Sequence, residues 1–177
     1  MALCLGINVP STTSRKVKTW KFASKFLWKN ATVQNKSELG RWVKQELLDL
    51  GPTFVKLGQI ASTRADLYPP EFTKELESLQ DDVPPVEIDI DVKYDIFKEF
   101  DPVPFKSASI GQVHMAVLQN GQKVVVKIKR PRILDIMKED TDTIRGIVHF
   151  LERIGIDTGN SSGLVLDESI EYLLGEA

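Results

Sequence analysis

A predicted β-hairpin in the second half of the chain constrains the fold more than any other feature of this sequence. Val113 to Leu118 and Lys123 to Lys129 have the length and the apolar content of strands. Asn120-Gly121 lies between them, and this dipeptide readily adopts the positive φ angles of a tight hairpin turn. Val103 to Ser109 is a candidate third strand, so the sequence predicts a small antiparallel sheet.

Helical periodicity surrounds the predicted hairpin on both sides. Before it, we expect helices over Arg15–Lys29, from Ser37 as N-cap to Gly51, from Pro52 to about Leu67, over Glu71–Leu79 and over Ile88–Phe100. Helical spacing returns from Pro131 to Ile154, and a last helix is expected from about Asp167. Because strands and helices are segregated along the chain, the sequence predicts an α+β fold rather than alternating βαβ units.

The composition excludes several protein classes. With 177 residues, 42% of them hydrophobic, the chain is long enough for one domain with a core, or for a small domain plus an extension. Cys4 is the single cysteine, so an internal disulfide framework is excluded. No run of about eighteen apolar residues occurs, so the sequence predicts no membrane-spanning helix.

The N-terminal segment is basic and contains no acidic residue before Glu38. Its seven basic residues are Arg15, Lys16, Lys18, Lys21, Lys25, Lys29 and Lys36. The net charge of the whole chain is −2, so the remainder of the chain has a net charge of −9. The same segment contains Trp20, Phe22, Phe26 and Trp28. This pattern is typical of a helix lying on an anionic membrane or of an organelle transit peptide. A surface helix that packs on a core and has a solvated basic face shows the same pattern.

Lys127 is the first candidate functional residue. It lies in the strand V-V-V-K-I-K directly after the hairpin turn. Protein kinases have a lysine at this place, in V-A-I-K, which pairs with the α- and β-phosphates of ATP. The alternative is a solvated strand face, because Lys123, Lys127 and Lys129 alternate along one side of the strand.

The second candidate is the turn from Ser107 to Gly111, just before the hairpin. Kinases have a glycine-rich turn here, whose backbone amides approach the phosphates. This turn has small residues, Gly111 as its one glycine and no G-x-G-x-x-G. Small side chains permit a close backbone approach, and an ordinary tight turn has the same composition.

The third candidate is the helical segment F-V-K-L-G-Q, from Phe54 to Gln59. Lys56 and Gln59 are three residues apart and share a helix face. Gly58 in mid-helix costs about 1 kcal/mol relative to alanine, which points to another backbone or a ligand pressed against it. The alternative is a cationic surface helix with an incidental glycine.

Together these motifs resemble the UbiB family, also called aarF-domain-containing kinases, from Ser37 to Pro131. The family's K-x-G-Q motif is matched by Lys56 to Gln59, within a similar stretch from Leu50 to Phe72 and before a similar L-x-x-L-Q-D-x-V-P-P segment. The family's alanine-rich A-A-A-S loop is replaced by Lys106 to Ser109, which keeps its last two residues, and S-I-G-Q-V-H follows.

The resemblance implies a protein-kinase-like N-lobe preceded by a helical extension, with the C-terminal lobe absent from this chain. Residues 1–14 show no strong period and include Pro10 and a Ser/Thr cluster, so a flexible N-terminus is expected there. The extension with K-x-G-Q is then expected over 15–99 and a partial N-lobe over 100–177. The resemblance implies ATP as cofactor, with Mg²⁺ in the complete protein, and nucleotide contacts from Lys127, Ser107, Ala108, Ser109, Ile110, Gly111 and Val113. By the same resemblance, Lys56, Gly58 and Gln59 fold over the cleft and suppress protein-kinase activity.

The family's E-x-D motif would place its glutamate at Glu176, next to the last residue of the chain. The sequence contains no H-x-D catalytic loop, no D-F-G and no cysteine–histidine cluster. We therefore expect no metal site and no phosphoryl transfer by this chain alone. His114 and His149 are expected to be packed or exposed rather than catalytic.

Two functions remain open at this stage. The resemblance implies part of an atypical kinase or ATPase of ubiquinone or plastoquinone metabolism, at a mitochondrial or plastid membrane and with quinone-pathway proteins as partners. The other function is a non-enzymatic, membrane-peripheral module that binds lipid or a partner through its basic N-terminus. Neither function involves nucleic acid.

Overall fold

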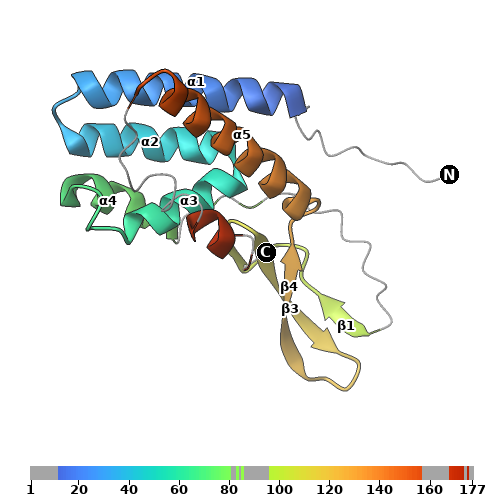
Figure 1. Ribbon diagram of the computed structural model, residues 1–177. Coiled ribbons are helices and arrows are strands. Elements are labelled where there is room, and N and C mark those ends of the chain that lie inside the picture. Colours follow the sequence, from blue (N-terminus) through green and yellow to red (C-terminus); the bar gives the residue numbers. More distant parts are fainter. Residues whose placement is uncertain are drawn as a thin grey trace.

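The computed structural model describes residues 12–80, 83, 85, 96–156, 168–173 and 175. Within these residues, a stack of helices lies on one side and a small antiparallel sheet projects from its edge (Figure 1). The order of helices, sheet and helices confirms the predicted α+β fold.

The helical part precedes the sheet in the chain. It contains α1 (Thr12–Thr32), α2 (Lys36–Leu50), α3 (Pro52–Ser62), α4 (Pro70–Glu77) and the 3₁₀ helix η1 (Ser78–Gln80). Apolar residues recur at helical spacing on α2, so one face of this helix is buried. The resulting helical core consists of Leu39, Val43, Leu47, Leu50, Phe54, Val55, Phe72, Leu76 and Leu79.

Several predicted helix boundaries are wrong. Helix α1 runs from Thr12 to Thr32 rather than from Arg15 to Lys29, so residues 12–14 of the segment predicted to be flexible are helical. The N-cap of α2 is Asn35 rather than Ser37, because the Asn35 side chain accepts hydrogen bonds from the backbone amides of Ser37 and Glu38. Helix α3 ends at Ser62 rather than near Leu67, and turns occupy the residues before Pro69-Pro70. Consecutive prolines disfavour helical backbone in the residues that precede them.

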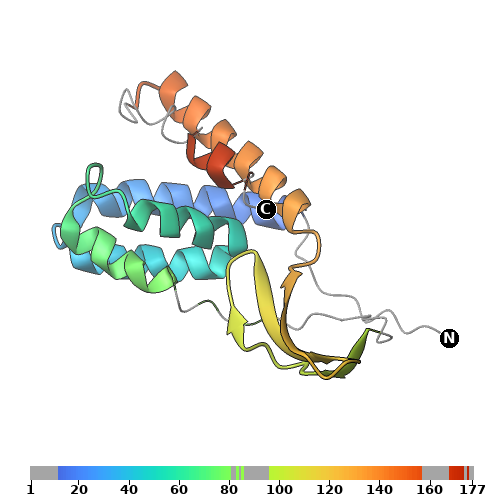
Figure 2. The ribbon, with the colours of Figure 1, turned by 90° about the horizontal axis from the view of Figure 1, so that it is seen from below.

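The sheet is built around β3 (Gly111–Leu118). β4 (Lys123–Lys129) pairs with one side of β3, and the chain reverses between them through Gly121, whose φ is +84°. β1 (Phe97–Phe100) and β2 (Lys106–Ser107) both pair with the other side of β3, one after the other along its length. The predicted hairpin is therefore confirmed (Figure 2).

Residues 97–100 correct the predicted helix over Ile88–Phe100. They form strand β1, with Phe97 opposite Leu118 and Phe100 opposite Ala116, and residues 88–95 lie outside the described residues. The pairing with β3 is non-local, and this tertiary context overrides the local helical pattern. The strand predicted over Val103–Ser109 is reduced to the two residues of β2.

Helix α5 (Ile133–Arg153) joins the sheet to the helical part. It packs against α1 and α3, crossing the helical stack in Figure 1. Asp140 of α5 is 2% exposed and accepts hydrogen bonds from the guanidinium of Arg15 and, at 2.6 Å, from the Thr53 hydroxyl. This buried ion pair ties α1, α3 and α5 together.

A second, smaller core lies where the sheet meets the helices. It contains Ile110 before β3, Ile133 and Met137 of α5, and Leu173 of the helical residues 168–173. Leu57 of α3 packs against it. The helical extension and the sheet therefore share apolar contacts through α3.

None of the helices described is long and apolar enough to cross a membrane.

Candidate functional site

Lys127 lies on the solvent-exposed face of β4. Side chains alternate along this strand, so Lys123, Val125, Lys127 and Lys129 face one side and the residues between them face the other. Val113 of β3 is directly opposite Lys127 and lies on the same face. The predicted nucleotide-contacting residues Lys127 and Val113 are thus neighbours on one open surface.

Lys106 is on the same face as Lys127. Lys106 pairs with Val113 from the β2 side, and Lys127 pairs with it from the β4 side. Because neighbouring strands are about 4.8 Å apart, the two lysine backbones lie roughly 10 Å apart across β3. Two lysine side chains therefore extend from the same face of the sheet, one on each side of Val113.

The turn from Ser107 to Gly111 is held by Arg130, directly after β4. The Ala108 amide donates to the Gly111 carbonyl at 2.8 Å and closes the turn. The Arg130 guanidinium donates to the Ala108 carbonyl at 3.0 Å and to the Ser107 hydroxyl at 3.2 Å. Burial lowers the pKa of Arg130, yet a guanidinium stays charged in proteins. A fixed positive charge therefore lies directly against the turn.

Arg130 was not among the site residues predicted from the sequence. The hairpin register could have identified it. Gly111, the last residue of the turn, pairs with Lys129, so the residue after Lys129 lies beside the turn.

Gln59 connects the K-x-G-Q helix to the same turn. The Ser109 hydroxyl donates to Gln59 Oε1 at 3.4 Å, and both side chains are buried. Gln59 Nε2 in turn donates to the Leu79 carbonyl at 2.8 Å, which fixes the orientation of the amide. Residues fifty positions apart in the sequence, which we selected from separate motifs, thus meet in one hydrogen-bond chain.

Gly58 and Gly111 are required by close packing. A Cβ atom on Gly58 would lie 2.6 Å from Cδ1 of both Leu47 and Leu79. A Cβ atom on Gly111 would lie 2.7 Å from the Ile128 carbonyl oxygen of β4. The nearest neighbours of Gly58 are therefore core side chains, and Gly111 permits close approach of two strands.

Lys56 faces the C-terminal helical residues. Its Nζ lies 5.6 Å from the centroid of the Tyr172 ring, within the range of a cation–π contact. The predicted E-x-D glutamate, Glu176, lies outside the described residues.

The two histidines are packed and exposed, respectively. His114 is 1% exposed, its Nδ1 lies 3.0 Å from the Asp101 carbonyl oxygen and its ring stacks on Phe100. His149 lies on the exposed part of α5, 3.4 Å from a carboxylate oxygen of Glu152.

The described part of the chain contains no cluster of three or more His, Cys, Asp or Glu side chains that could hold a metal ion. The side chains on the β3–β4 face fit phosphate oxygens, which are anionic, better than a cation.

Comparisons with known proteins show the family of this chain. A family model described as the ABC1 atypical kinase-like domain matches residues 86–176. The chain belongs to the ABC1 atypical kinase-like family. The predicted resemblance is thereby confirmed, and the matched ABC1 segment includes the sheet, the turn and α5, whereas the K-x-G-Q helix α3 precedes it.

Relatives in plants and bacteria are similar over most of this ABC1-family chain. Protein ACTIVITY OF BC1 COMPLEX KINASE 7, chloroplastic, from Arabidopsis thaliana is 33% identical over 92% of this chain and 28% of its own length. Protein ACTIVITY OF BC1 COMPLEX KINASE 8, chloroplastic, from the same plant is 40% identical over 77% of this chain and 20% of its own length. Probable protein kinase UbiB from Marinobacter nauticus is 42% identical over 68% of this chain and 24% of its own length.

The chain therefore spans about a fifth to just over a quarter of the length of these curated relatives. Among solved structures, the complex of Rv3197 with erythromycin from Mycobacterium tuberculosis is 34% identical over 45% of this chain and 20% of that chain, with a TM-score of 0.37.

Proposed function

We propose that this chain forms the phosphate-binding part of an ABC1-type nucleotide site, with ATP as the ligand. Lys127 pairs with the phosphates from β4, and the turn from Ser107 to Gly111 covers them. The hydrogen bond between Ser109 and Gln59 is the observation that carries the proposal, because it joins the family's K-x-G-Q motif to the turn beside the lysine face.

The chemistry of the site supports this role. A lysine on a rigid strand is a compact ammonium that needs little reordering to pair with phosphate oxygens. Lys106 contributes a second ammonium on the same face, and Arg130 holds the turn with a third charge. Mg²⁺ bound together with the nucleotide would neutralise part of the phosphate charge.

For a protein of the full length of these relatives, we propose an atypical kinase or ATPase of isoprenoid-quinone metabolism in a plastid. Two of the relatives are named as kinases and as chloroplastic, which supports the plastid. The sequence of this chain contains neither H-x-D nor D-F-G, so we expect no ATP hydrolysis by the chain on its own.

A thermal-shift experiment with MgATP and MgADP tests the proposed site. Nucleotide at about 100 times Kd should stabilise the folded chain by about 2.7 kcal/mol, which raises Tm by several degrees. We expect Lys127→Ala to lose this shift. The matched control is Lys123→Ala, on the same face at the other end of β4, which should keep it. A wild-type shift that survives in Lys127→Ala would contradict the assignment.

A second candidate function is binding to an anionic membrane surface through α1. This helix has no acidic residue, and Trp28 is 65% exposed beside the exposed Lys21 and Lys25. Exposed aromatic and basic side chains on one helix favour the interface of an anionic bilayer. Sedimentation with vesicles tests it: Trp28→Ala should weaken binding to vesicles that contain phosphatidylglycerol. Binding that is equal for neutral vesicles would count against this function.

A further inference from the structure

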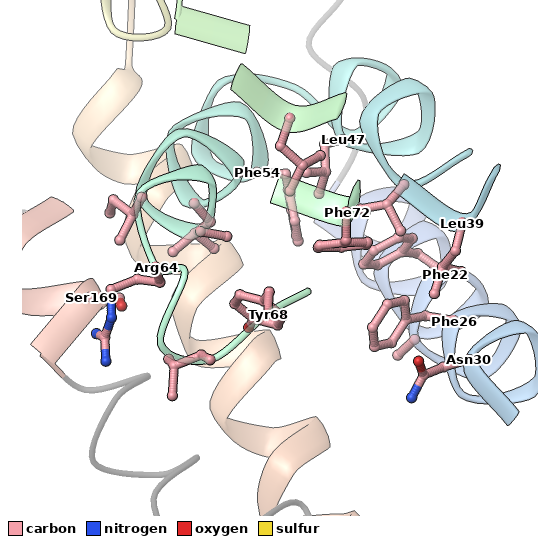
Figure 3. Close-up of a pocket in the computed structure, with 18 of the residues that line it drawn as sticks. Phe22, Phe26, Asn30, Leu39, Leu47, Phe54, Arg64, Tyr68, Phe72 and Ser169 are labelled. Carbon is pink, nitrogen blue, oxygen red and sulfur yellow. The ribbon is translucent and has the colours of Figure 1, made fainter. Parts of the chain in front are cut away.

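The helices line a large, half-open apolar cavity that is separate from the lysine face of the sheet. Its volume is about 810 Å³, within the range of about 300–1,000 Å³ that is typical of small-molecule sites. The walls come from α1, α2, α3, α4 and α5 and from the turn after α3 (Figure 3).

Aromatic rings form much of the wall. Phe22 and Phe26 face the cavity from α1, Phe54 from α3 and Phe72 from α4. Several lining residues, including Leu47, belong to the helical core and are almost fully buried. The cavity is therefore set into the core of the helical part rather than into its polar surface.

A cavity with such a wall favours a hydrocarbon occupant. The lining atoms of an empty space lose their dispersion contacts on one side. Water is a poor filler, since a buried water needs several polar partners and apolar cavities bind apolar molecules instead. Nucleotides, sugars and peptides are disfavoured because the aromatic part of the wall offers few hydrogen-bonding groups for them.

Polar residues lie at both ends of the row of rings, and Thr19 and Tyr68 also line the cavity. Arg64 and Ser169 are at one end in Figure 3, and Asn30 is at the other. Arg64 is already paired with Asp66, with Nη2 2.8 Å from Oδ2. Lys36, beside Asn30, hydrogen-bonds only to neutral Asn30 oxygens among its described contacts, with Nζ 3.3 Å from Oδ1. The Asn30 end therefore offers a cation to a polar or anionic headgroup.

We propose that this cavity binds the hydrocarbon chain of a lipid, with the lipid's polar end at Asn30 and Lys36. The elongated arrangement of the rings between two polar ends matches a long acyl or prenyl chain. Leu57, Gly58 and Ile60 of α3 also line the cavity, so the helix that reaches the Ser107–Gly111 turn through Gln59 is one of its walls. The proposal does not depend on nucleotide binding.

Displacement of a fluorescent fatty acid, cis-parinaric acid, from the purified chain tests the proposal. We expect saturable binding, displaced by palmitic acid, by geranylgeraniol or by both. Displacement by palmitic acid alone would identify the bound hydrocarbon as an acyl chain. Displacement by geranylgeraniol alone would identify it as a prenyl chain. Absence of saturable binding of all three compounds to the folded chain would overturn the proposal.

Variants that fill the cavity separate it from other apolar surfaces. Ala61 lines the cavity on α3, so Ala61→Phe should weaken binding at least about tenfold, which is about 1.4 kcal/mol. The matched control is Ala31→Phe, on the exposed end of α1 and outside the lining, which should bind as the wild type does.

A second filling variant guards against misfolding of the first. Ala23→Phe approaches the cavity from α1 and should have the same effect as Ala61→Phe, provided that its Tm is within a few degrees of the wild type. Wild-type affinity in a folded filling variant would overturn the assignment of the binding to this cavity.

Discussion

The helical part and the sheet differ in how deeply they bury their side chains. Every residue of the helical core is at most 8% exposed. In the sheet, by contrast, no residue of β4 is fully buried, Val125 is 64% exposed, and Phe105 before β2 is 74% exposed. The sheet carries the candidate chemistry on an open face, and the helices provide most of the packing.

Because packing and the candidate site lie in different parts of the molecule, we expect stability and nucleotide binding to respond to different substitutions. Burial of apolar surface is the dominant favourable contribution to folding, so changes in the helical part should lower the free energy of unfolding most. Changes on the lysine face should alter binding and leave unfolding nearly unchanged. Four substitutions test this separation of packing in the helical part from binding on the lysine face.

Arg15→Ala should destabilise the chain by about 3 kcal/mol, because it leaves the buried Asp140 carboxylate without its cation. The measurement is the free energy of unfolding from urea titration. Lys16→Ala, at an exposed position next in the chain, is the control and should change it by less than about 0.5 kcal/mol. Equal, small effects of both substitutions would show that the ion pair does not hold α1 to α5.

Arg130→Ala should lower the free energy of unfolding by about 1.5 kcal/mol, since it removes charge-assisted hydrogen bonds from a half-buried turn. It should also increase proteolysis near Ala108, because the turn loses its fixed partner. The exposed Arg41→Ala on α2 serves for comparison. Unchanged proteolysis in the Arg130 variant would mean that the turn is held by other contacts.

Gly58→Ala should destabilise by about 1 kcal/mol. Overpacking against Leu47 and Leu79 costs about 1–3 kcal/mol, and the better helix propensity of alanine offsets about 1 kcal/mol of that. The matched control is Gly146→Ala on α5, where a Cβ atom would meet nothing within 4 Å. This control should stabilise by up to about 1 kcal/mol. The same sign for both substitutions would refute the packing argument.

Lys127→Ala should change the free energy of unfolding by less than about 0.5 kcal/mol, as expected for an exposed side chain. The nucleotide-dependent rise in Tm should nevertheless disappear. If Lys127→Ala unfolds the chain as readily as Arg15→Ala does, then the division between a packing part and a binding part is wrong.

The elements that are determined by local sequence were predicted well. The hairpin follows from Asn120-Gly121 and two short apolar segments, and the junction of α2 and α3 follows from Gly51-Pro52. β1 was missed because its four residues become a strand only through pairing with β3, about twenty residues further along. Local periodicity contains no information about that partner.

The candidate site shows the same division. Lys127, Gln59 and Ser109 were selected from motifs, and the structure brings Gln59 and Ser109 together. Arg130 and Asp140 were not selected, because their roles depend on partners 22 and 125 positions away, Ala108 and Arg15. A single sequence does not show which distant residue a buried charge will meet.

The ion pair between Arg15 and Asp140 also has a consequence for maturation of the protein. A processing protease that cut within α1 after Arg15 would remove the guanidinium and leave the Asp140 carboxylate buried, with the Thr53 hydroxyl as its remaining described donor. The segment from Arg15 to Thr32 thus contributes to the stability of the folded domain through this ion pair. We therefore expect a chain cut after Arg15 to unfold more readily than a chain cut before it.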